Sequence, residues 1–382
     1  MRALIAGTVA ALALFSGAQS VPLKTVATNL NNPRKLFLGP GGAIYVVEAG
    51  TGGSDKCFGT GPNAICLGLT GSITRIANGA QSRVVTGLVS WATPAQQRAQ
   101  GPAAVLVRGG TYDVLMGDAV ANARGGNALG PDGATAGDLI ATPQGKAAPS
   151  VIAKLAVFEA AHNPDHAAGP GPKFGDPPID SNPYALTAYR GGFAVADAGA
   201  NDLLWISPKG TISVLAVFPI QTEKLTKATA TRLGAPTLTS LSVQSVPSSV
   251  TVGPDGALYV GELTGRPFQR AAAHVWRVVP GEKPSLFASG FTNITDLAFD
   301  GKNLLVLEAA AKGLWDDPTF AGALIRLAPN GTRTVLASTG LVAPTGLTVG
   351  TGSIYIANYG FFPGTGPGPH GEVVSLPASL GS

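Results

Sequence analysis

The sequence predicts an all-β protein, a six-bladed β-propeller, and three observations support this fold class. Six hydrophobic segments end on a carboxylate or an asparagine, and each follows a Pro-led or Ile-led segment at a nearly constant distance. The 382-residue chain contains 52 Gly and 30 Pro, yet only 13% of its residues are charged. This composition suits many short strands joined by tight turns and is too apolar for a disordered chain.

The repeats emerge when the polar endings are aligned. These endings are Glu48, Asp118, Asp197, Glu262, Glu308 and Asn358. Each lies 14 to 16 residues after the residue that opens its repeat, which is Pro33, Pro102, Pro183, Pro247, Ile294 or Pro344. A turn such as "GPGG", "RGG" or "GPDG" lies between them. Each repeat therefore begins with a β-hairpin.

Two further strands complete most repeats. "GSITRIA", "LLWISP", "HVWRVVP", "ALIRLAP" and "GEVVSLP" predict a third strand, and "SRVVTGL", "TISVLAVF", "PSLFASGF" and "TRTVLAST" a fourth. In the less regular second repeat, "GDLIATP" and "SVIAKLAVF" are the expected outer strands. Four antiparallel strands repeated radially form propeller blades, whose arrangement leaves only short edges exposed.

The last repeat lacks a fourth strand, which indicates how the ring closes. The segment Leu23–Leu30, "LKTVATNL", resembles the fourth strand "TRTVLASTGL" of the preceding repeat. We expect this N-terminal strand to complete the sixth blade, because an unpaired edge would promote aggregation.

The N-terminus is typical of a secretory signal peptide. Met1-Arg2 is basic, an apolar run follows, and "SGAQS" offers small residues for cleavage, so residues 1–20 are the expected signal and 21–382 a single propeller domain. The expected location is secreted or periplasmic, where Cys57 and Cys66 would form a disulfide. No later segment is long enough to span a membrane, and the scattered net charge of +4 argues against nucleic-acid binding.

The six polar endings should lie around one mouth of the central channel, because the inner two strands of each blade are antiparallel. Two interpretations remain open. Each side chain could accept backbone N–H bonds in the turn after its strand, as a local cap. Alternatively, some could converge on a cation such as Ca²⁺, with Asp296 and either Glu48 or Asn358 as a mixed oxygen site.

Other side chains are expected at the same mouth and are candidates for ligand binding. The inner segments place Arg34, Lys35, Tyr184 and Asp296 there. Loops that follow three of the polar endings add the aromatic residues Phe268, Trp315, Phe320, Phe361 and Phe362. The basic pair could neutralise an anionic ligand or pair with the acidic residues, and the aromatic residues could frame a cleft or anchor their own loops.

One loop contains further possible metal ligands. Glu159–Tyr184 includes His162, Asp165, His166, Asp176 and Asp180. Two His residues four positions apart share a metal only on a helix, and Pro164 disfavours a helix there. An ordered turn is the alternative.

Long strings of the chain resemble the ScyD/ScyE family of exported propellers, named for proteins encoded with the biosynthesis of the pigment scytonemin. They are "NPDHAAG…DSNPYAL", "GFAVADAGANDLLWISPKGTISVLAVFP" and "VPSSVTVGPDGALYVGELTGRPF…HVWRVVPGEKP". The resemblance covers about residues 25 to 378, and it implies an NHL-like fold and a role in extracytoplasmic pigment assembly. It supplies no catalytic residue set.

Two functional hypotheses follow. The first is an exported propeller that binds a small molecule or an extracytoplasmic protein at the channel mouth. The second is a hydrolase or lyase that depends on a divalent metal, by likeness of fold to gluconolactonase-like and paraoxonase-like enzymes. Its ligands, matched by position only, would be Glu48, Asp197, Asp296 and Asn358.

Overall fold

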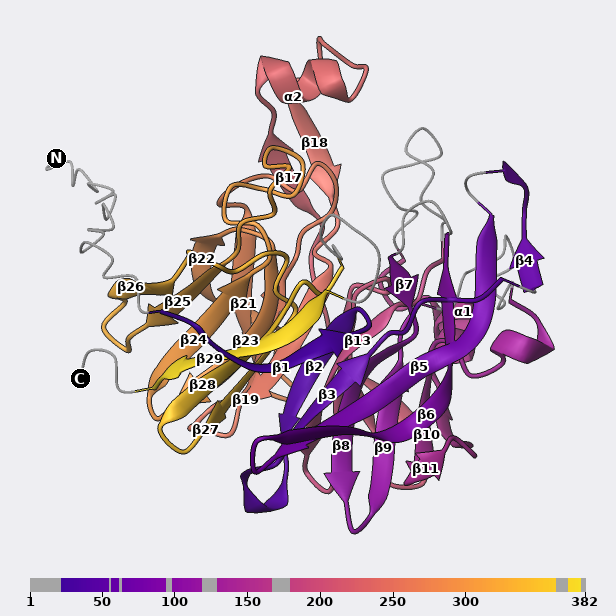
Figure 1. Ribbon diagram of the computed structural model, residues 1–382. Helices are drawn as coiled ribbons and strands as arrows, with labels where there is room; N and C mark the ends of the chain where they lie inside the picture. The colour runs from indigo at the N-terminus through magenta and orange to yellow at the C-terminus, as the bar shows by residue number, and fades with distance from the viewer. Residues whose placement is uncertain are drawn as a thin grey trace, which may run out of the picture.

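The computed structural model of the protein describes residues 22–54, 56–61, 64–93, 98–118, 129–166, 179–361 and 370–378. Within them the chain forms a β-propeller (Figure 1). Five of its radial sheets have four strands, and the other has seven, of which four form a regular blade. The expected six four-stranded units are therefore confirmed. The expected signal peptide, residues 1–20, lies outside the described residues.

Each blade runs from an inner strand at the channel to an outer strand at the rim. In this order the strands are β2 (Pro33–Leu38), β3 (Ile44–Glu48), β5 (Ile65–Ala77) and β6 (Ala80–Ala92); β8 (Pro102–Arg108), β9 (Thr111–Met116), β10 (Asp138–Pro143) and β12 (Ser150–Lys154); β13 (Pro183–Tyr189), β14 (Gly192–Asp197), β15 (Asp202–Ile206) and β16 (Ile212–Val217); β19 (Pro247–Val252), β20 (Leu258–Glu262), β21 (Ala273–Val278) and β22 (Ser285–Phe291); β23 (Ile294–Asp300), β24 (Asn303–Glu308), β25 (Ala323–Leu327) and β26 (Arg333–Ala337); β27 (Gly346–Gly350), β28 (Ser353–Asn358), β29 (Gly371–Pro377) and β1 (Lys24–Leu30).

The inner strands form a closed ring, since β2 contacts both β8 and β27 and each of the others contacts its neighbours in chain order. A register shift follows the first residue of β2, where Pro33 lies opposite Glu48 and the next pair is Leu36 with Val46. Proline suits the first residue of a strand because no ladder N–H is needed there. Arg34 and Lys35, which lie within the shift, are buried.

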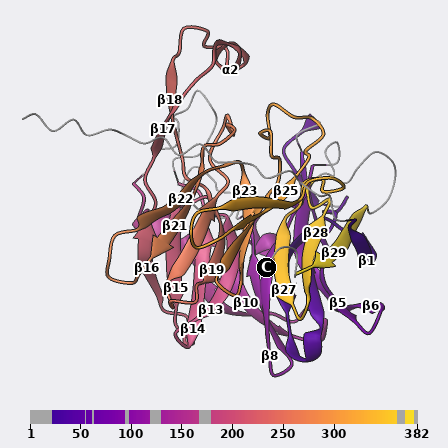
Figure 2. The same ribbon diagram turned by 90° about the vertical axis from the view of Figure 1, so that its left-hand side faces the viewer.

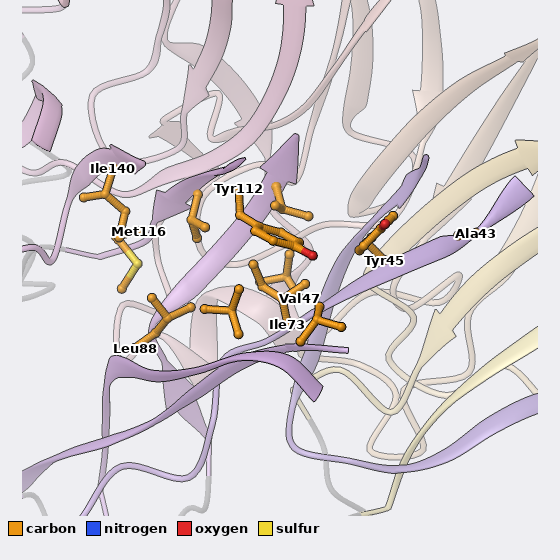
Figure 3. Packing of buried hydrophobic residues seen from close by; sticks show 12 residues of the cluster. Ala43, Tyr45, Val47, Ile73, Leu88, Tyr112, Met116 and Ile140 are labelled. Carbon is orange, nitrogen blue, oxygen red and sulfur yellow. The ribbon is translucent and has the colours of Figure 1, made fainter. Parts of the chain in front are cut away.

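The core lies between the blades rather than within one layer. Six apolar clusters bridge the six pairs of adjacent blades, including the pair formed by the first and last blades. Figure 3 shows the cluster between the first two blades, where Tyr45, Val47 and Ile73 face Tyr112 and Met116. Both faces of a middle strand are covered in this way, which explains why β3 and β14 are buried along their whole length.

Strand β1 closes the ring as expected. It pairs antiparallel with β29, and these two strands lie side by side in Figure 1. Ala27 and Leu30 of β1 are buried against Ile44, Val46 and Val373. One strand therefore belongs to the sixth blade by hydrogen bonding and contacts the first blade by packing.

The remaining elements are insertions. They are β4 (Lys56–Phe58), β7 (Ala99–Gln100), β11 (Gly145–Lys146), β17 (Gln221–Lys224), β18 (Ser240–Val243), α1 (Leu155–His162) and α2 (Lys227–Arg232), with short turns η1 (Pro40–Gly42) and η3 (Pro131–Gly133). The β17–β18 hairpin carries α2 and projects well beyond the disc (Figure 2). The predicted disulfide is confirmed: Cys57 and Cys66 lie opposite each other on β4 and β5 and are bonded.

The second blade differs from expectation in two respects. The string "SVIAKLAVF" is a strand only to Lys154, and Leu155 begins helix α1, whose Leu155 and Phe158 pack between the second and third blades. The residue opposite Pro102 is Met116, so Asp118 lies two residues beyond the position that the other repeats give to their polar residue. The alignment at Asp118 was therefore wrong, because strand register is set by pairing and not by distance along the chain.

No helix in the described part of the chain is long and apolar enough to cross a membrane.

Candidate functional site

The polar residues at the strand ends bond to the segment that enters the same blade. We call the face where these segments meet the upper face (top in Figure 1). Glu48 accepts the backbone N–H of Asn31 (2.7 Å), and Asp197 accepts that of Asn182 (2.6 Å). Glu308 accepts the N–H of Thr292 (2.7 Å), and Asn358 accepts that of Val342 (2.7 Å). Glu262 accepts a hydrogen bond from the Ser245 hydroxyl. The cap interpretation placed the donors in the turn after each strand, and Asp197 does accept N–H bonds from that turn, from Gly199 and Ala200. The donors of the five bonds above instead precede the inner strand of the same blade.

Glu48 and Glu262 hold the largest networks. Besides Asn31, Glu48 accepts bonds from Ser72, Thr74 and Arg83 and is fully buried. Glu262 accepts bonds from Gln221, from the indole N–H of Trp276, and from both the backbone N–H and the ring of His274. These partners belong to the same blade or to the segment that enters it, except Gln221, which belongs to the inserted β17–β18 hairpin. The carboxylates thus stabilise blade ends.

Asp118 lies elsewhere on the upper face. Its backbone N–H donates to Asn182 Oδ1 at 3.1 Å, and Trp91 donates to its carbonyl. Burial raises the pKa of its carboxyl to about 8, and the charges of Asp180 and Asp197 add to the effect. The raised pKa favours the protonated form of Asp118 over that of an ordinary aspartate, and the strand register places this residue outside the capping series.

The residues expected to bind a channel metal do not fit one. Within the described ranges, no three Asp, Glu, His or Cys side chains are placed to share an ion, so Glu48, Asp197 and Asp296 do not converge. The amide oxygen of Asn358 accepts the N–H of Val342, and its amide nitrogen donates to the Gly340 carbonyl and to Glu372.

An ion pair spans the channel instead. Lys35 Nζ lies 2.9 Å from Asp296 Oδ1, with both side chains buried, and the ammonium stands 5.2 Å from the centre of the Tyr184 ring. The backbone N–H groups of Leu297 and Leu347 also donate to Asp296. Burial lowers the pKa of Lys35 and raises that of Asp296, and in each case the partner charge opposes the shift. These side chains line a lower cavity of about 280 Å³.

Above this pair a cleft of about 680 Å³ opens on the upper face. Three arginines line it: the buried Arg34, and the exposed Arg98 and Arg266. Tyr184 of the inner strand β13 lines it as well. Loops from three blades add the aromatic side chains, which are Phe268, Trp315, Phe320 and Phe361. None of the described residues that line the cleft is acidic.

The structure thus brings together most of the sequence candidates for ligand binding. Arg34, Tyr184, Phe268, Trp315 and Phe361 share the cleft, whereas Lys35 and Asp296 lie in the lower cavity. Phe362 lies outside the described residues.

Sequence reasoning missed Arg98 and Arg266 as lining residues. Arg266 stands beside the predicted aromatic residue in "GRPF", which is a local signal. Arg98 lies just before β7, and nothing in its neighbourhood marks it. Sequence reasoning also missed Arg232, which extends from α2 over the ring of Trp315 at 4.7 Å and donates to the Trp315 carbonyl.

The buried Glu308 predicts a pH dependence of stability. Burial raises its pKa from 4.5 to about 7, although Thr292, Arg333 and Arg270 oppose the shift. The folded state therefore holds a proton that the unfolded chain releases, and stability falls as pH rises from 4.5 to 7, by up to about 3 kcal/mol for this group. Urea unfolding across this range should show a shallower fall in Glu308→Gln than in the wild type. Equal slopes, or an equal change in the exposed control Glu282→Gln, would contradict the assignment.

Comparison with known proteins agrees with the fold. No protein-family model and no curated protein matches the chain. Among solved structures, the PQQ-bound aldose sugar dehydrogenase of Streptomyces coelicolor has a TM-score of 0.52 at 12% identity, over 93% of this chain and 96% of that one. A putative oxidoreductase (glucose dehydrogenase) of Thermus thermophilus has a TM-score of 0.51 at 16% identity, over 93% of this chain and 99% of that one.

A putative gluconolactonase is also similar, with a TM-score of 0.49 at 11% identity over 96% of this chain and 94% of that one. At such low identity these likenesses concern the fold alone. The chain is therefore a β-propeller by sequence repeat, by strand pairing and by comparison.

Proposed function

We propose that the protein is an exported binding propeller whose upper-face cleft takes a small, planar, anionic molecule. The observation that carries this proposal is the lining of the cleft, which combines three arginines with aromatic side chains and has no acidic residue among those described. Its volume of about 680 Å³ lies in the range of small-molecule sites, roughly 300 to 1,000 Å³.

The charge of the cleft favours an anion. Arg34 is only 4% exposed, and its guanidinium donates to the carbonyl oxygens of Asn32, Pro33, Ala99 and Gly360. These carbonyls orient the group but carry no net charge, so its positive charge is not cancelled there. Arg266 is exposed at the rim, where it can contact a ligand directly. An arginine pairs well with a carboxylate or another planar anion.

The aromatic side chains favour a planar ligand. Phe320 and Phe361 are arranged edge to face with ring centres 6.5 Å apart, and Trp315 is held by Arg232. Rings supported in this way lose little entropy when a flat molecule packs on them. Because they come from loops of different blades, the cleft exists only in the closed ring.

The resemblance to the ScyD/ScyE family supports a finer proposal, in which the protein is exported and acts beside extracytoplasmic pigment assembly. The signal-like N-terminus and the disulfide between Cys57 and Cys66 agree with such a location. The metal-dependent hydrolase alternative has no comparable support, because its expected ligands do not converge.

Binding of a named probe tests the proposal. We expect naphthalene-2-carboxylate to bind in isothermal titration and to change Trp fluorescence, and naphthalene-2-carboxamide to bind at least about tenfold more weakly, since one charge-assisted pair is worth about 1.5–3 kcal/mol. Trp315→Ala and Arg266→Gln should each lower the affinity for naphthalene-2-carboxylate by about tenfold.

Arg190→Gln is the matched control, because Arg190 lies in the β13–β14 turn on the opposite face. Its affinity should equal that of the wild type. Failure of the carboxylate to bind at 1 mM (about −4 kcal/mol), or equal binding by the wild type and the two cleft variants, would overturn the proposal.

A further inference from the structure

The β17–β18 hairpin is inserted between the third and fourth blades and rises from the upper face (Figure 1). Its two strands form a sheet of their own, and its outer end carries helix α2. The ring of blades closes without this insertion, because β1 completes the sixth blade. The contacts that the hairpin makes therefore indicate what it is used for.

The lower part of the hairpin is bonded to the fourth blade. Gln221 Nε2 donates to Glu262 Oε2 at 2.7 Å, and Gln269 Nε2 donates to the Lys224 carbonyl at 2.9 Å. Gln269 directly follows Phe268, which lines the cleft and has a left-handed backbone with a φ of 60°. A bulky residue keeps this conformation only where its surroundings hold it. The bond from Gln269 is one of the contacts that hold this loop.

The outer end of the hairpin contacts the loop of the fifth blade. Arg232, the last residue of α2, is exposed to solvent. Its guanidinium carbon lies 4.7 Å from the centre of the Trp315 ring, and the same group donates to the Trp315 carbonyl. One side chain thus holds both the ring and the backbone of a residue that lines the cleft.

The other bonds around Trp315 fix the chain and not the ring. The N–H of Ala311 donates to the Ala321 carbonyl at 2.8 Å and closes the loop. The N–H of Leu314 donates to Asn293 Oδ1 at 2.9 Å. These bonds leave the side-chain torsions of Trp315 undetermined, whereas a guanidinium attracted to the indole face restricts them.

We propose that Arg232 is a positioning residue of the upper-face cleft, which holds the Trp315 ring ready for a ligand without contacting the ligand itself. This inference rests on the proposed function and names the residue through which the inserted hairpin sets affinity there. Trp315 lines the cleft, and Arg232 is not among the described lining residues. Restricting a side chain before binding reduces the entropy that the complex loses when it forms.

The proposed role distinguishes Arg232 from the arginines that line the cleft. Arg34 and Arg266 favour an anion by their charge, so their loss should affect a carboxylate more than the matching carboxamide. Arg232 acts through an aromatic ring, so its loss should lower the affinity for both ligands by the same factor.

Isothermal titration with naphthalene-2-carboxylate and naphthalene-2-carboxamide tests this role. Arg232→Ala should weaken each ligand by about twofold to fivefold, the range expected for an exposed cation–π contact. In the Trp315→Ala background the same substitution should have no further effect, because its route to the ligand is gone. An unchanged affinity in Arg232→Ala, a full loss in the Trp315→Ala background, or a loss confined to the carboxylate would overturn the proposal.

Acrylamide quenching of the ligand-free protein tests the positioning independently of the proposed function. Arg232→Ala should increase the quenching of Trp fluorescence, because it uncovers one face of the Trp315 ring. It should not do so in a Trp315→Phe background, where the other three tryptophans remain. Quenching equal to that of the wild type would overturn the proposal. If quenching increases but naphthalene-2-carboxylate does not bind the wild type at about 1 mM, the proposed function fails and the positioning of Trp315 stands.

Lys227→Ala is the matched control, because Lys227 is another exposed cation of the same helix. This variant should keep wild-type affinity and quenching, with circular dichroism verifying that every variant is folded. A loss of affinity equal to that of Arg232→Ala would assign the effect to the general charge of the hairpin and would also contradict the proposal.

Discussion

Deletion of Leu23–Leu30 is expected to lower the free energy of unfolding by more than about 5 kcal/mol, which is comparable to the whole stability of many domains. The segment contains strand β1, which supplies the outer strand of the sixth blade. Its loss exposes the edge of β29 and uncovers the apolar cluster that joins the last blade to the first. Thermal and urea unfolding should show the loss, and the variant should aggregate through the open edge.

A matched pair of point variants distinguishes the loss of buried packing by β1 from the effect of any substitution in this strand. Leu30 is buried and Thr28 is exposed on the same strand. Leu30→Asp should cost more than about 4 kcal/mol because it buries a charge in an apolar cluster, whereas Thr28→Asp should stay within about 0.5 kcal/mol. A deletion variant that melts with the wild type would show that the ring does not need β1.

Substitution of Glu48 is expected to have the second-largest effect. Glu48→Ala should lower the free energy of unfolding by about 2–4 kcal/mol, because it leaves the Asn31 N–H and the hydroxyls of Ser72 and Thr74 without their acceptor. Arg83 also loses its partner, with an N–O distance of 2.8 Å, but its side chain is 43% exposed. Solvent therefore limits the share of this ion pair.

Urea unfolding of two further variants tests that division. Arg83→Ala should cost less than about 1 kcal/mol, because it removes only the screened ion pair and an exposed hydrogen bond to the Asn29 carbonyl. Glu282→Ala, on the exposed surface, should be neutral within about 0.5 kcal/mol. If Glu48→Ala also proves neutral, the buried network does not stabilise the blade end.

Closure of the ring is needed for the upper-face cleft as well as for the stability of the folded protein. Arg34 comes from the first blade, Tyr184 from the third, Phe268 from the fourth and Trp315 from the fifth. No pair of adjacent blades holds all of them. A variant that opens the ring should therefore lose both ligand binding and cooperative unfolding. Trp315→Ala should weaken ligand binding by about tenfold and still unfold as cooperatively as the wild type.

Several features could be predicted from the sequence because they depend on short-range patterns. Alternating apolar segments, turns rich in Gly and Pro, and a repeated Pro before each inner strand identify the blades. The missing fourth strand of the last repeat identified β1 as its replacement. The chain has only two cysteines, so a disulfide within it could join only Cys57 and Cys66, and these are bonded. The aromatic residues of the loops could be assigned to one face because the direction of the chain alternates within a blade.

What the sequence determined by itself is the repeat: the four-stranded unit, its number, the closing strand and the face that carries the loops, all of which follow from local periodicity. Only the tertiary structure decided how the polar residues are used. Glu48 and Asp197 accept hydrogen bonds from the segments that enter their own blades. Asp118 lies out of register with the other polar residues. Glu159, which follows the second blade, lies near Asp202 of the third. Such partners are distant along the chain, and a carboxylate takes the donors or charges that packing brings within about 3 to 6 Å.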